Sequence, residues 1–442
     1  MMFSKKEIQR LMVPLILEMF LSLLVGFADS VMVASAGNAA VSAVSLVDSI
    51  SVLMVVLFSA LANGGSVVIG QLLGRGEEER ARGCGAQLMT LLLLASGIVT
   101  ALLLFFTQGL LQLLFGSAEE EILVNCRIYY RILMSSVPFL ALFNGGSALC
   151  RITGDSRTPM RISVIVNLVN IAGNAVCIYV LHMGVAGVAL PSLLSRIVGV
   201  VLIVPVVTRQ SFALSIRERS LYRLEGRTVK NIFSIAIPGA IENSMFQFGK
   251  ILLMSLISTL STASITANAI GNTVGNMHNI IGMGINIGLT TIVSRCVGAG
   301  DYDGAERYTY RMVRWVYVAE GIADIGMLLA IPLVNRMYGV TGEAAQLSTY
   351  INLIHGVATI LFWPIAFMFN NAMVAAGDSR FTMLVSSGAM WIGRVALSYL
   401  LISGFHFGVL SIWIAWVIDW FIRIAFFIPR WRSGIWKTKA IH

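Results

Sequence analysis

Residues 8–34, IQRLMVPLILEMFLSLLVGFADSVMVA, decide the class of this protein. The stretch is longer than the roughly 20 residues that a helix needs to cross a bilayer, and its two acids, Glu18 and Asp29, stand isolated among apolar side chains. Similar apolar stretches recur to the end of the chain, and no polar segment between them is long enough for a soluble domain. The sequence therefore predicts an all-α integral membrane protein.

The composition supports this class. Of the 442 residues, 57% are hydrophobic and 12% are charged, whereas about a quarter are charged in a typical soluble domain. The net charge of +9 comes from basic residues in short loops, as in the cytoplasmic loops of membrane proteins, so we expect no nucleic-acid partner. The five cysteines form no close pairs and no metal-ligand spacing, so we expect neither a metal site nor a cofactor.

The apolar stretches predict twelve membrane-spanning helices. Their approximate bounds are 8–34, 42–72, 84–107, 122–150, 160–181, 186–208, 231–260, 265–298, 310–336, 346–376, 382–403 and 409–430. Lys and Arg gather at both chain ends and in every second loop. By the positive-inside rule both termini are expected in the cytoplasm, with the protein in the plasma membrane, and this orientation requires an even number of spans.

The chain also contains an internal repeat with an offset of 223 or 224 residues. The matching positions are Pro14 and Pro238, Glu18 and Glu242, Gly154-Asp155-Ser156-Arg157 and Gly377-Asp378-Ser379-Arg380. An even number of spans in each half makes the two repeats parallel, related by an axis near the membrane normal. We therefore predict two pseudo-symmetric six-helix bundles, an N-terminal lobe at 1–210 and a C-terminal lobe at 231–442, joined at 211–230 by a cytoplasmic linker that is expected to be solvated.

Acidic side chains inside the apolar stretches are candidate ion-coupling residues, because an ionisable group at the bilayer centre costs roughly 2.5–3.5 kcal/mol. Glu18 and Asp29 lie about three turns apart and therefore on one face of the first helix. Glu242 repeats Glu18 in the second half. A coupling role is our interpretation of Asp29, Glu18 and Glu242, and a structural hydrogen-bonding role is the alternative for each.

Other polar side chains within the predicted spans are candidates for a substrate cleft. They are Asn63, Asn167, Asn170, Asn174, Gln247, Lys250, Asn268, Asn272, Asn276, Asn279 and Arg394. The four asparagines of the eighth span form one stripe, which is expected either to line the cleft or to join helices by hydrogen bonds. Lys250 lies about 12 Å along the helix from Glu242, so it requires an acid from another helix or an anionic ligand.

The glycine-containing turns at Gly74 and Gly298 end predicted helices. Neither is followed by Gly-Lys-Ser/Thr nor preceded by a strand, so they do not indicate a phosphate-binding loop. No nucleotide-binding domain and no set of nucleophile, base and acid is recognisable in the sequence. We therefore expect a transporter that does not hydrolyse ATP, rather than an enzyme.

Several motifs, in order and repeated, resemble the multidrug and toxic compound extrusion (MATE) family over essentially the whole chain. These motifs are Ala28-Asp29-Ser30-Val31-Met32-Val33, Gly70-Gln71-Leu72-Leu73-Gly74, Gly154-Asp155-Ser156-Arg157, Asn170-Ile171-Ala172-Gly173-Asn174, Ile237-Pro238-Gly239 and Val297-Gly298-Ala299-Gly300-Asp301. The resemblance implies a twelve-helix antiporter that exports organic, often cationic compounds in exchange for H⁺ or Na⁺ by alternating access. It also implies that Asp29 is the coupling residue of the N-terminal lobe.

The sequence departs from the MATE pattern at two positions. Asn174 stands where many members carry a second acid on the fifth helix, and Phe246 stands where some branches carry a glutamate, about one turn beyond Glu242. The resemblance therefore leaves H⁺ and Na⁺ open as the coupling ion. The alternative function is a lipid-linked oligosaccharide flippase of the same superfamily, which the cationic Lys250, Arg196 and Arg394 favour. In either case we expect a monomer in the lipid bilayer that binds a small-molecule substrate.

Overall fold

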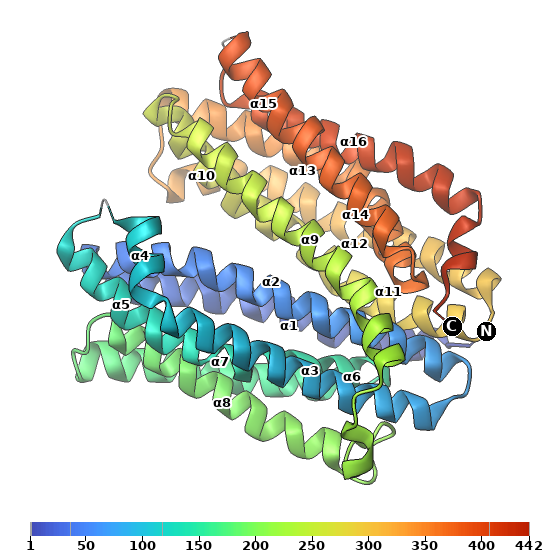
Figure 1. Cartoon of the computed structure of the whole chain (residues 1–442). Coiled ribbons are helices and arrows are strands. Elements are labelled where there is room, and N and C mark those ends of the chain that lie inside the picture. Colours follow the sequence, from blue (N-terminus) through green and yellow to red (C-terminus); the bar gives the residue numbers. More distant parts are fainter. Residues whose placement is uncertain (1, 36, 117, 406, 442) are drawn as a thin grey trace. The chain divides into compact units, whose positions relative to one another are not determined.

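The computed structural model describes residues 2–35, 37–116, 118–405 and 407–441, and within these ranges all regular elements are helices (Figure 1). The chain forms two compact units, residues 4–240 and residues 241–442 together with 1–3. The units divide inside one long helix, α9 (Gly226–Ile257). The sequence analysis predicts lobes that end at residue 210 and begin again at residue 231.

Among its described residues, the first unit contains eight α-helices and the first turns of α9. They are α1 (Lys5–Ala34), α2 (Asn38–Gly74), α3 (Glu78–Phe105), α4 (Thr107–Phe115), α5 (Glu120–Ser135), α6 (Val137–Ile152), α7 (Arg157–Ala175) and α8 (Ala186–Thr208). Helix α7 continues as a π-helical turn, Val176–Val180. Helix α2 packs against α3, α5 and α6, while α7 packs against α1 and α8.

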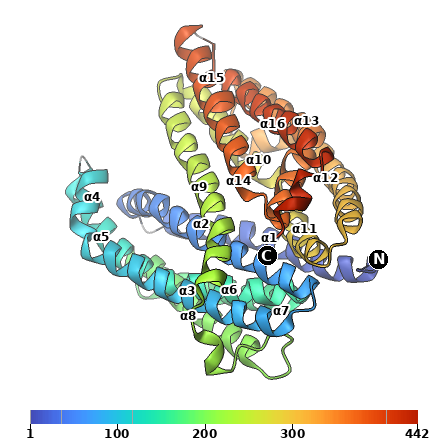
Figure 2. The ribbon, with the colours of Figure 1, turned by 45° about the vertical axis from the view of Figure 1, so that its right-hand side comes forward.

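The described part of the second unit contains the rest of α9 and seven further α-helices. They are α10 (Thr262–His278), α11 (Ile280–Gly298), α12 (Tyr302–Met337), α13 (Gly342–Ala376), α14 (Ser379–Gly388), α15 (Leu397–Tyr399) and α16 (Leu410–Arg432). The π-helical segment Ala389–Ala396 joins α14 to α15, and a second one, Leu400–Gly404, continues the same long rod beyond α15 (Figure 2). Helix α13 packs against α10, α11, α12 and α16.

The predicted membrane class is confirmed by helix length and composition. Among the described residues, eleven helical segments are long and apolar enough to cross a membrane. Helix α9 is 32 residues long but is not one of the eleven, and its Glu242, Asn243, Gln247 and Lys250 make it more polar than the others. With α9 the segments correspond to the twelve predicted spans, except that the predicted span 265–298 is divided at Asn279 into α10 and α11.

The helix ends follow from local chemistry. Ser4 and Glu7 form a capping box at the start of α1, where Glu7 accepts a hydrogen bond from the Ser4 N–H at 2.7 Å and the Ser4 hydroxyl accepts one from the Glu7 N–H at 3.2 Å. The repeated Gly-Asp-Ser-Arg motif ends a helix in both halves, because Gly154 and Gly377 adopt φ of +96° and +102°. The two matching glycines of the repeat therefore serve the same backbone conformation in both halves.

The predicted linker, residues 211–230, packs into the first unit. Leu214 and Ile216 are buried, and the Glu225 N–H donates to the Gln87 side chain on α3 at 2.9 Å. The sequence analysis predicts a solvated crossover in this region. Leu214 and Ile216 explain the difference. Their burial removes apolar surface from water, which favours packing of this segment over solvation.

Candidate functional site

The carboxylate of Asp29 is the centre of a polar cluster in the first unit. Asp29 is half-buried on α1, and the Asn174 Nδ2 of α7 donates to its Oδ1 at 2.9 Å. With its amide nitrogen turned to the acid, Asn170 lies 3.0 and 3.2 Å from the two carboxylate oxygens, and its oxygen then accepts from Ser192. The packing of α1 on α7 brings these residues together. Two neutral amides therefore hold one carboxylate.

A second acid of this cluster comes from α2. The Tyr129 hydroxyl of α5 donates to Asp48 Oδ1 at 3.1 Å, and Asp48 interacts electrostatically with both Asp29 and Arg196. Arg196 on α8 also donates to the Ser136 hydroxyl at 2.6 Å. We call Asp29, Asp48, Tyr129, Asn170, Asn174 and Arg196 the Asp29 cluster. Asp48 is not one of the predicted site residues, although an acid inside the predicted span 42–72 is itself a signal of function.

Glu18 lies outside the Asp29 cluster. Its Oε1 accepts from Arg151 Nη2 at 2.7 Å and from the Ser163 hydroxyl at 3.0 Å, and the residue is buried. Although Glu18 and Asp29 share a helix face, about three turns of rise separate them, so they meet different partners. The ion pair with Arg151 favours the structural alternative for Glu18.

Glu242 belongs to a chain of charges in the second unit. Its Oε1 accepts from Asn370 Nδ2 at 2.9 Å and lies 3.9 Å from Arg423 Nη1. Arg423 also donates to Asp419 at 3.0 Å, and Asp419 accepts from Arg394 at 2.7 Å. Arg394 and Asp419 are almost completely buried, with 1% and 0% exposure of their side chains. We call Glu242, Arg423, Asp419 and Arg394 the Glu242 network.

Lys250 lies beside this network. Its Nζ is 5.1 Å from the centre of the Phe246 ring, and the Arg394 guanidinium is 5.3 Å from the same ring. In the part of the chain that the structure describes, Lys250 forms no ion pair within 4.0 Å. Of the two partners that the sequence analysis proposes for Lys250, an acid from another helix is therefore not among the described residues, and its charged neighbour is a second cation, Arg394.

The predicted amide stripe has members in different environments. Asn268 is buried and accepts from the Trp413 ring nitrogen at 3.2 Å, whereas Asn276 is exposed. Asn279 stands at the break between α10 and α11, where its amide donates to the Gly275 carbonyl at 3.2 Å. The remaining predicted cleft residues comprise the exposed Asn63 and the half-buried Asn167, Gln247 and Asn272.

A buried histidine–carboxylate group in the second unit was also missed by sequence reasoning. His278 Nδ1 lies 2.7 Å from Asp324 Oδ1, and its ring centre is 5.6 Å from that of His355. One turn before Asp324, Glu320 accepts from the Gly282 N–H at 2.8 Å. As with Asp48, these ionisable residues lie inside predicted spans, and this placement could have marked them as candidate site residues. No group of three or more His, Cys, Asp or Glu side chains suited to a metal is found among the described residues.

Comparison with known proteins adds the family. The MatE family model matches the chain twice, over residues 14–176 and 238–400. The two matches begin at Pro14 and Pro238, which confirms the internal repeat and its offset of 224.

Relatives and a solved structure match over almost the full length. The chain is 26% identical to the probable multidrug resistance protein NorM of Thermotoga maritima, over 99% of this chain and 94% of that protein. It is 24% identical to the uncharacterized transporter YisQ of Bacillus subtilis, over 97% and 94%. An outward-facing MATE transporter structure aligns with a TM-score of 0.91 at 19% identity, over 98% and 96%. The chain therefore belongs to the MatE family of membrane transporters, the multidrug and toxic compound extrusion proteins.

Proposed function

We propose that this transporter is a secondary-active antiporter that exports organic compounds, cationic or amphipathic, in exchange for H⁺ or Na⁺ by alternating access. The observation that carries the proposal is the half-buried carboxylate of Asp29, which is held by the amides of Asn170 and Asn174 rather than by an arginine. A carboxylate without a fixed counter-charge can bind a cation from solution without first breaking an ion pair.

The chemistry of the Asp29 cluster suits a small coupling cation. A proton can bind the carboxylate directly, and Na⁺ can be coordinated by the carboxylate together with the amide oxygens of the two asparagines once these amides rotate. Asp48 adds negative potential that favours either cation, and its hydroxyl donor Tyr129 holds it in place. With Asn174 where many members carry an acid, Asp48 supplies a second carboxylate from another helix.

Coupling follows if the coupling ion and a cationic substrate compete for this carboxylate. Uptake of the ion neutralises Asp29 and releases the substrate, and loss of the ion on the other side restores the charge that attracts the next substrate. Each ligand then shifts the equilibrium between the two transport conformations by its differential affinity for them. Such competition requires an acid that can be unpaired, and this favours Asp29 over Glu18.

The decisive experiment is transport of a cationic dye by the purified full-length protein in liposomes under an imposed pH or Na⁺ gradient. We expect one gradient to drive accumulation of the dye and Asp29→Asn to abolish it. Asp303→Asn, which removes an exposed acid from the start of α12, is the matched control and should transport normally. Full gradient-driven transport by Asp29→Asn would overturn the coupling role.

We also propose the plasma membrane as the location, with both termini in the cytoplasm and a monomer as the working unit. Support comes from the alternation of basic and uncharged loops. A fluorescent protein fused after His442 should fluoresce and alkaline phosphatase fused there should be inactive. The reverse result would contradict the proposed orientation, and light scattering of the purified protein tests the oligomeric state.

The alternative function, a flippase for lipid-linked oligosaccharides, is supported by one observation. Lys250 and Arg394 lie on the same aromatic ring, Phe246, and the described residues offer Lys250 no acid within 4.0 Å. Because Arg394 is paired with Asp419, Lys250 is the cation that suits an anionic group such as a lipid diphosphate. Binding that responds to neither pH nor Na⁺, together with transport of a diphosphate lipid in the same liposomes, would favour this alternative over the antiporter.

A further inference from the structure

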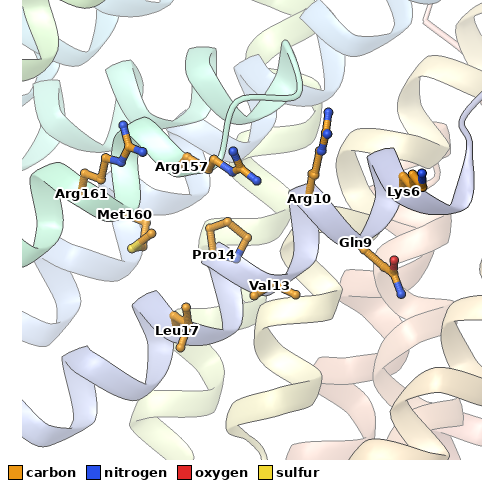
Figure 3. Close-up of a pocket in the computed structure, with 9 residues that line it drawn as sticks. All are labelled: Lys6, Gln9, Arg10, Val13, Pro14, Leu17, Arg157, Met160 and Arg161. Atoms are coloured by element: carbon orange, nitrogen blue, oxygen red, sulfur yellow. The ribbon is translucent and has the colours of Figure 1, made fainter.

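A basic groove lies where helices α1 and α7 begin. It has a cavity volume of about 460 Å³ and is open to the outside (Figure 3). Its lining residues are Lys6, Gln9, Arg10, Val13, Pro14 and Leu17 of α1 and Arg157, Met160 and Arg161 of α7. All nine belong to the first unit, and the two helices pack side by side.

The groove carries four positive charges and no acid. Lys6, Arg10, Arg157 and Arg161 are all exposed, and among the described residues none of them forms an ion pair within 4.0 Å. The acids nearest to these cations in the sequence, Glu7 and Asp155, accept hydrogen bonds from backbone N–H groups at the starts of α1 and α7. Glu7 accepts from the Ser4 N–H, and Asp155 accepts from the backbone N–H groups of Arg157 and Thr158 at 3.1 Å each. An anion bound in the groove would therefore meet four cations and no acid among the lining residues.

Below the charges, both helices continue as apolar stripes. On α1 the positions Lys6, Arg10, Val13, Leu17, Phe20 and Leu24 follow one another at steps of four and three residues, which places them on one face. On α7 the corresponding positions are Arg157, Arg161, Ile165 and Leu168. Val13 and Leu17 are 53% and 47% exposed, and the apolar residues that follow them on both stripes are also exposed. Each stripe thus has two cations at its start and exposed hydrocarbon beyond them.

The second half of the repeat lacks this arrangement. At the offset of 224, Lys6 corresponds to Lys230 but Arg10 corresponds to Ser234. At the offset of 223 seen in the Gly-Asp-Ser-Arg motif, Arg157 corresponds to Arg380 but Arg161 corresponds to Leu384. The second half therefore keeps two of the four cations, and the full set of four is particular to the first half.

We propose that the groove binds an anionic phospholipid of the cytoplasmic leaflet. The phosphate lies among Lys6, Arg10, Arg157 and Arg161, and an acyl chain follows the apolar stripe of α1 from Val13 towards Leu24. A phospholipid has its charged phosphate at the membrane surface and its acyl chains deeper in the membrane. The two stripes present cations and then apolar side chains in the same sequence, so they fit such a lipid. This lipid site does not depend on which compound the protein transports.

The test measures lipid binding to the full-length protein in detergent. Native mass spectrometry would follow phosphatidylglycerol and, as the zwitterionic reference, phosphatidylcholine. We expect Arg157→Gln/Arg161→Gln to weaken phosphatidylglycerol binding about 10- to 30-fold, because each basic residue near a lipid surface contributes appreciably to anion attraction. Phosphatidylcholine binding should be unaffected.

The matched control is Arg380→Gln/Arg432→Gln, which removes two exposed arginines from the second half of the chain. It should bind phosphatidylglycerol as the parent does. An equal loss in both double variants, or no loss in the first, would overturn the proposal. Should Arg157→Gln/Arg161→Gln fail to fold, Lys6→Gln/Arg10→Gln gives the same comparison from α1.

A second pair of measurements distinguishes a lipid from a free anion. Leu17→Ser should weaken phosphatidylglycerol binding while all four cations remain, because it interrupts the apolar stripe. Millimolar inorganic phosphate should leave most of the lipid bound. Complete displacement by inorganic phosphate, or unchanged lipid binding in Leu17→Ser, would show a site for soluble anions and overturn the lipid assignment.

Discussion

Asn170 and Arg394 occupy equivalent positions in the two halves, at the repeat offset of 224, and they meet acids in opposite ways. Asn170 joins Asn174 in holding Asp29 with neutral amide groups. Arg394 holds Asp419 by a buried ion pair of 2.7 Å, and Arg423 holds the same acid from its other side. One scaffold thus carries an acid held by neutral amides and an acid held by two arginines.

The difference separates two uses of buried charge. Breaking a buried ion pair by removing one partner costs about 3–5 kcal/mol, so Asp419 cannot readily give up its two arginines during a transport cycle. Hydrogen bonds from amides to a carboxylate contribute less and can be replaced by bonds to a cation. The comparison therefore favours the first half for coupling and the second half for stability and substrate contact.

The largest effect on transport is expected from a substitution in the first half. Asp29→Asn should reduce gradient-driven dye transport to the level of liposomes without protein, because no carboxylate remains to exchange the coupling ion. Its thermal unfolding midpoint should stay close to that of the parent, since an asparagine can still hydrogen-bond to Asn170 and Asn174. Loss of the folded protein would mean that Asp29 is structural.

The next largest effect is a loss of stability, expected from a substitution in the second half. Arg394→Met should lower the free energy of unfolding by about 3–5 kcal/mol, because Asp419 would lose one of its two arginines while remaining buried. Chemical unfolding in detergent measures the change. The matched variant Asn170→Ala removes the equivalent side chain of the first half and should cost only about 1–2 kcal/mol. Equal costs would remove the distinction between the halves.

A smaller effect sharpens the account of the Asp29 cluster. Asp48→Asn should weaken binding of the coupling cation about tenfold, since it removes a negative charge that interacts with Asp29. Transport against the concentration of the driving ion, fitted for its half-maximal value, measures the shift. Tyr129→Phe removes the hydrogen bond but keeps the charge, so it should change this value less than Asp48→Asn does.

The smallest effect concerns the substrate. Lys250→Gln should leave stability nearly unchanged, because Lys250 has no acid partner within 4.0 Å among the described residues. It should weaken binding of anionic compounds about fivefold through the loss of one cation. Competition between charged dyes in detergent would measure this. Weaker binding of cationic dyes alone would contradict a substrate-facing role for this cation.

Much of the fold could be predicted from the sequence because the bilayer imposes its pattern locally. Apolar stretches of fixed length predict the spans, and the repeat offset follows from motifs such as Gly154-Asp155-Ser156-Arg157. The break at Asn279 could not be predicted in this way, since asparagines and glycines occur on both sides of it in the stretch 265–298 and the stretch lacks proline. Breaks of this kind are decided by packing against other helices.

The candidate site was less predictable, because pairing between helices depends on tertiary contacts. Periodicity placed Glu18 and Asp29 on one face, but it could not show that Arg151 of α6 holds the first and α7 holds the second. The same limit hid the contacts of Asp48 with Tyr129 and of His278 with Asp324. The acids themselves were visible in the sequence, whereas their partners were not.

Helix α9 gives the division of the chain a mechanical meaning. Its first turns belong to one unit and its remainder, with Glu242 and Lys250, belongs to the other, and Pro238 stands just before the boundary at residues 240 and 241. A proline has no N–H for the helical hydrogen bond, so the rod bends there at lower cost than elsewhere. Glu242 and Lys250 follow Pro238 on one continuous helix, so a bend at this proline would reorient both side chains together.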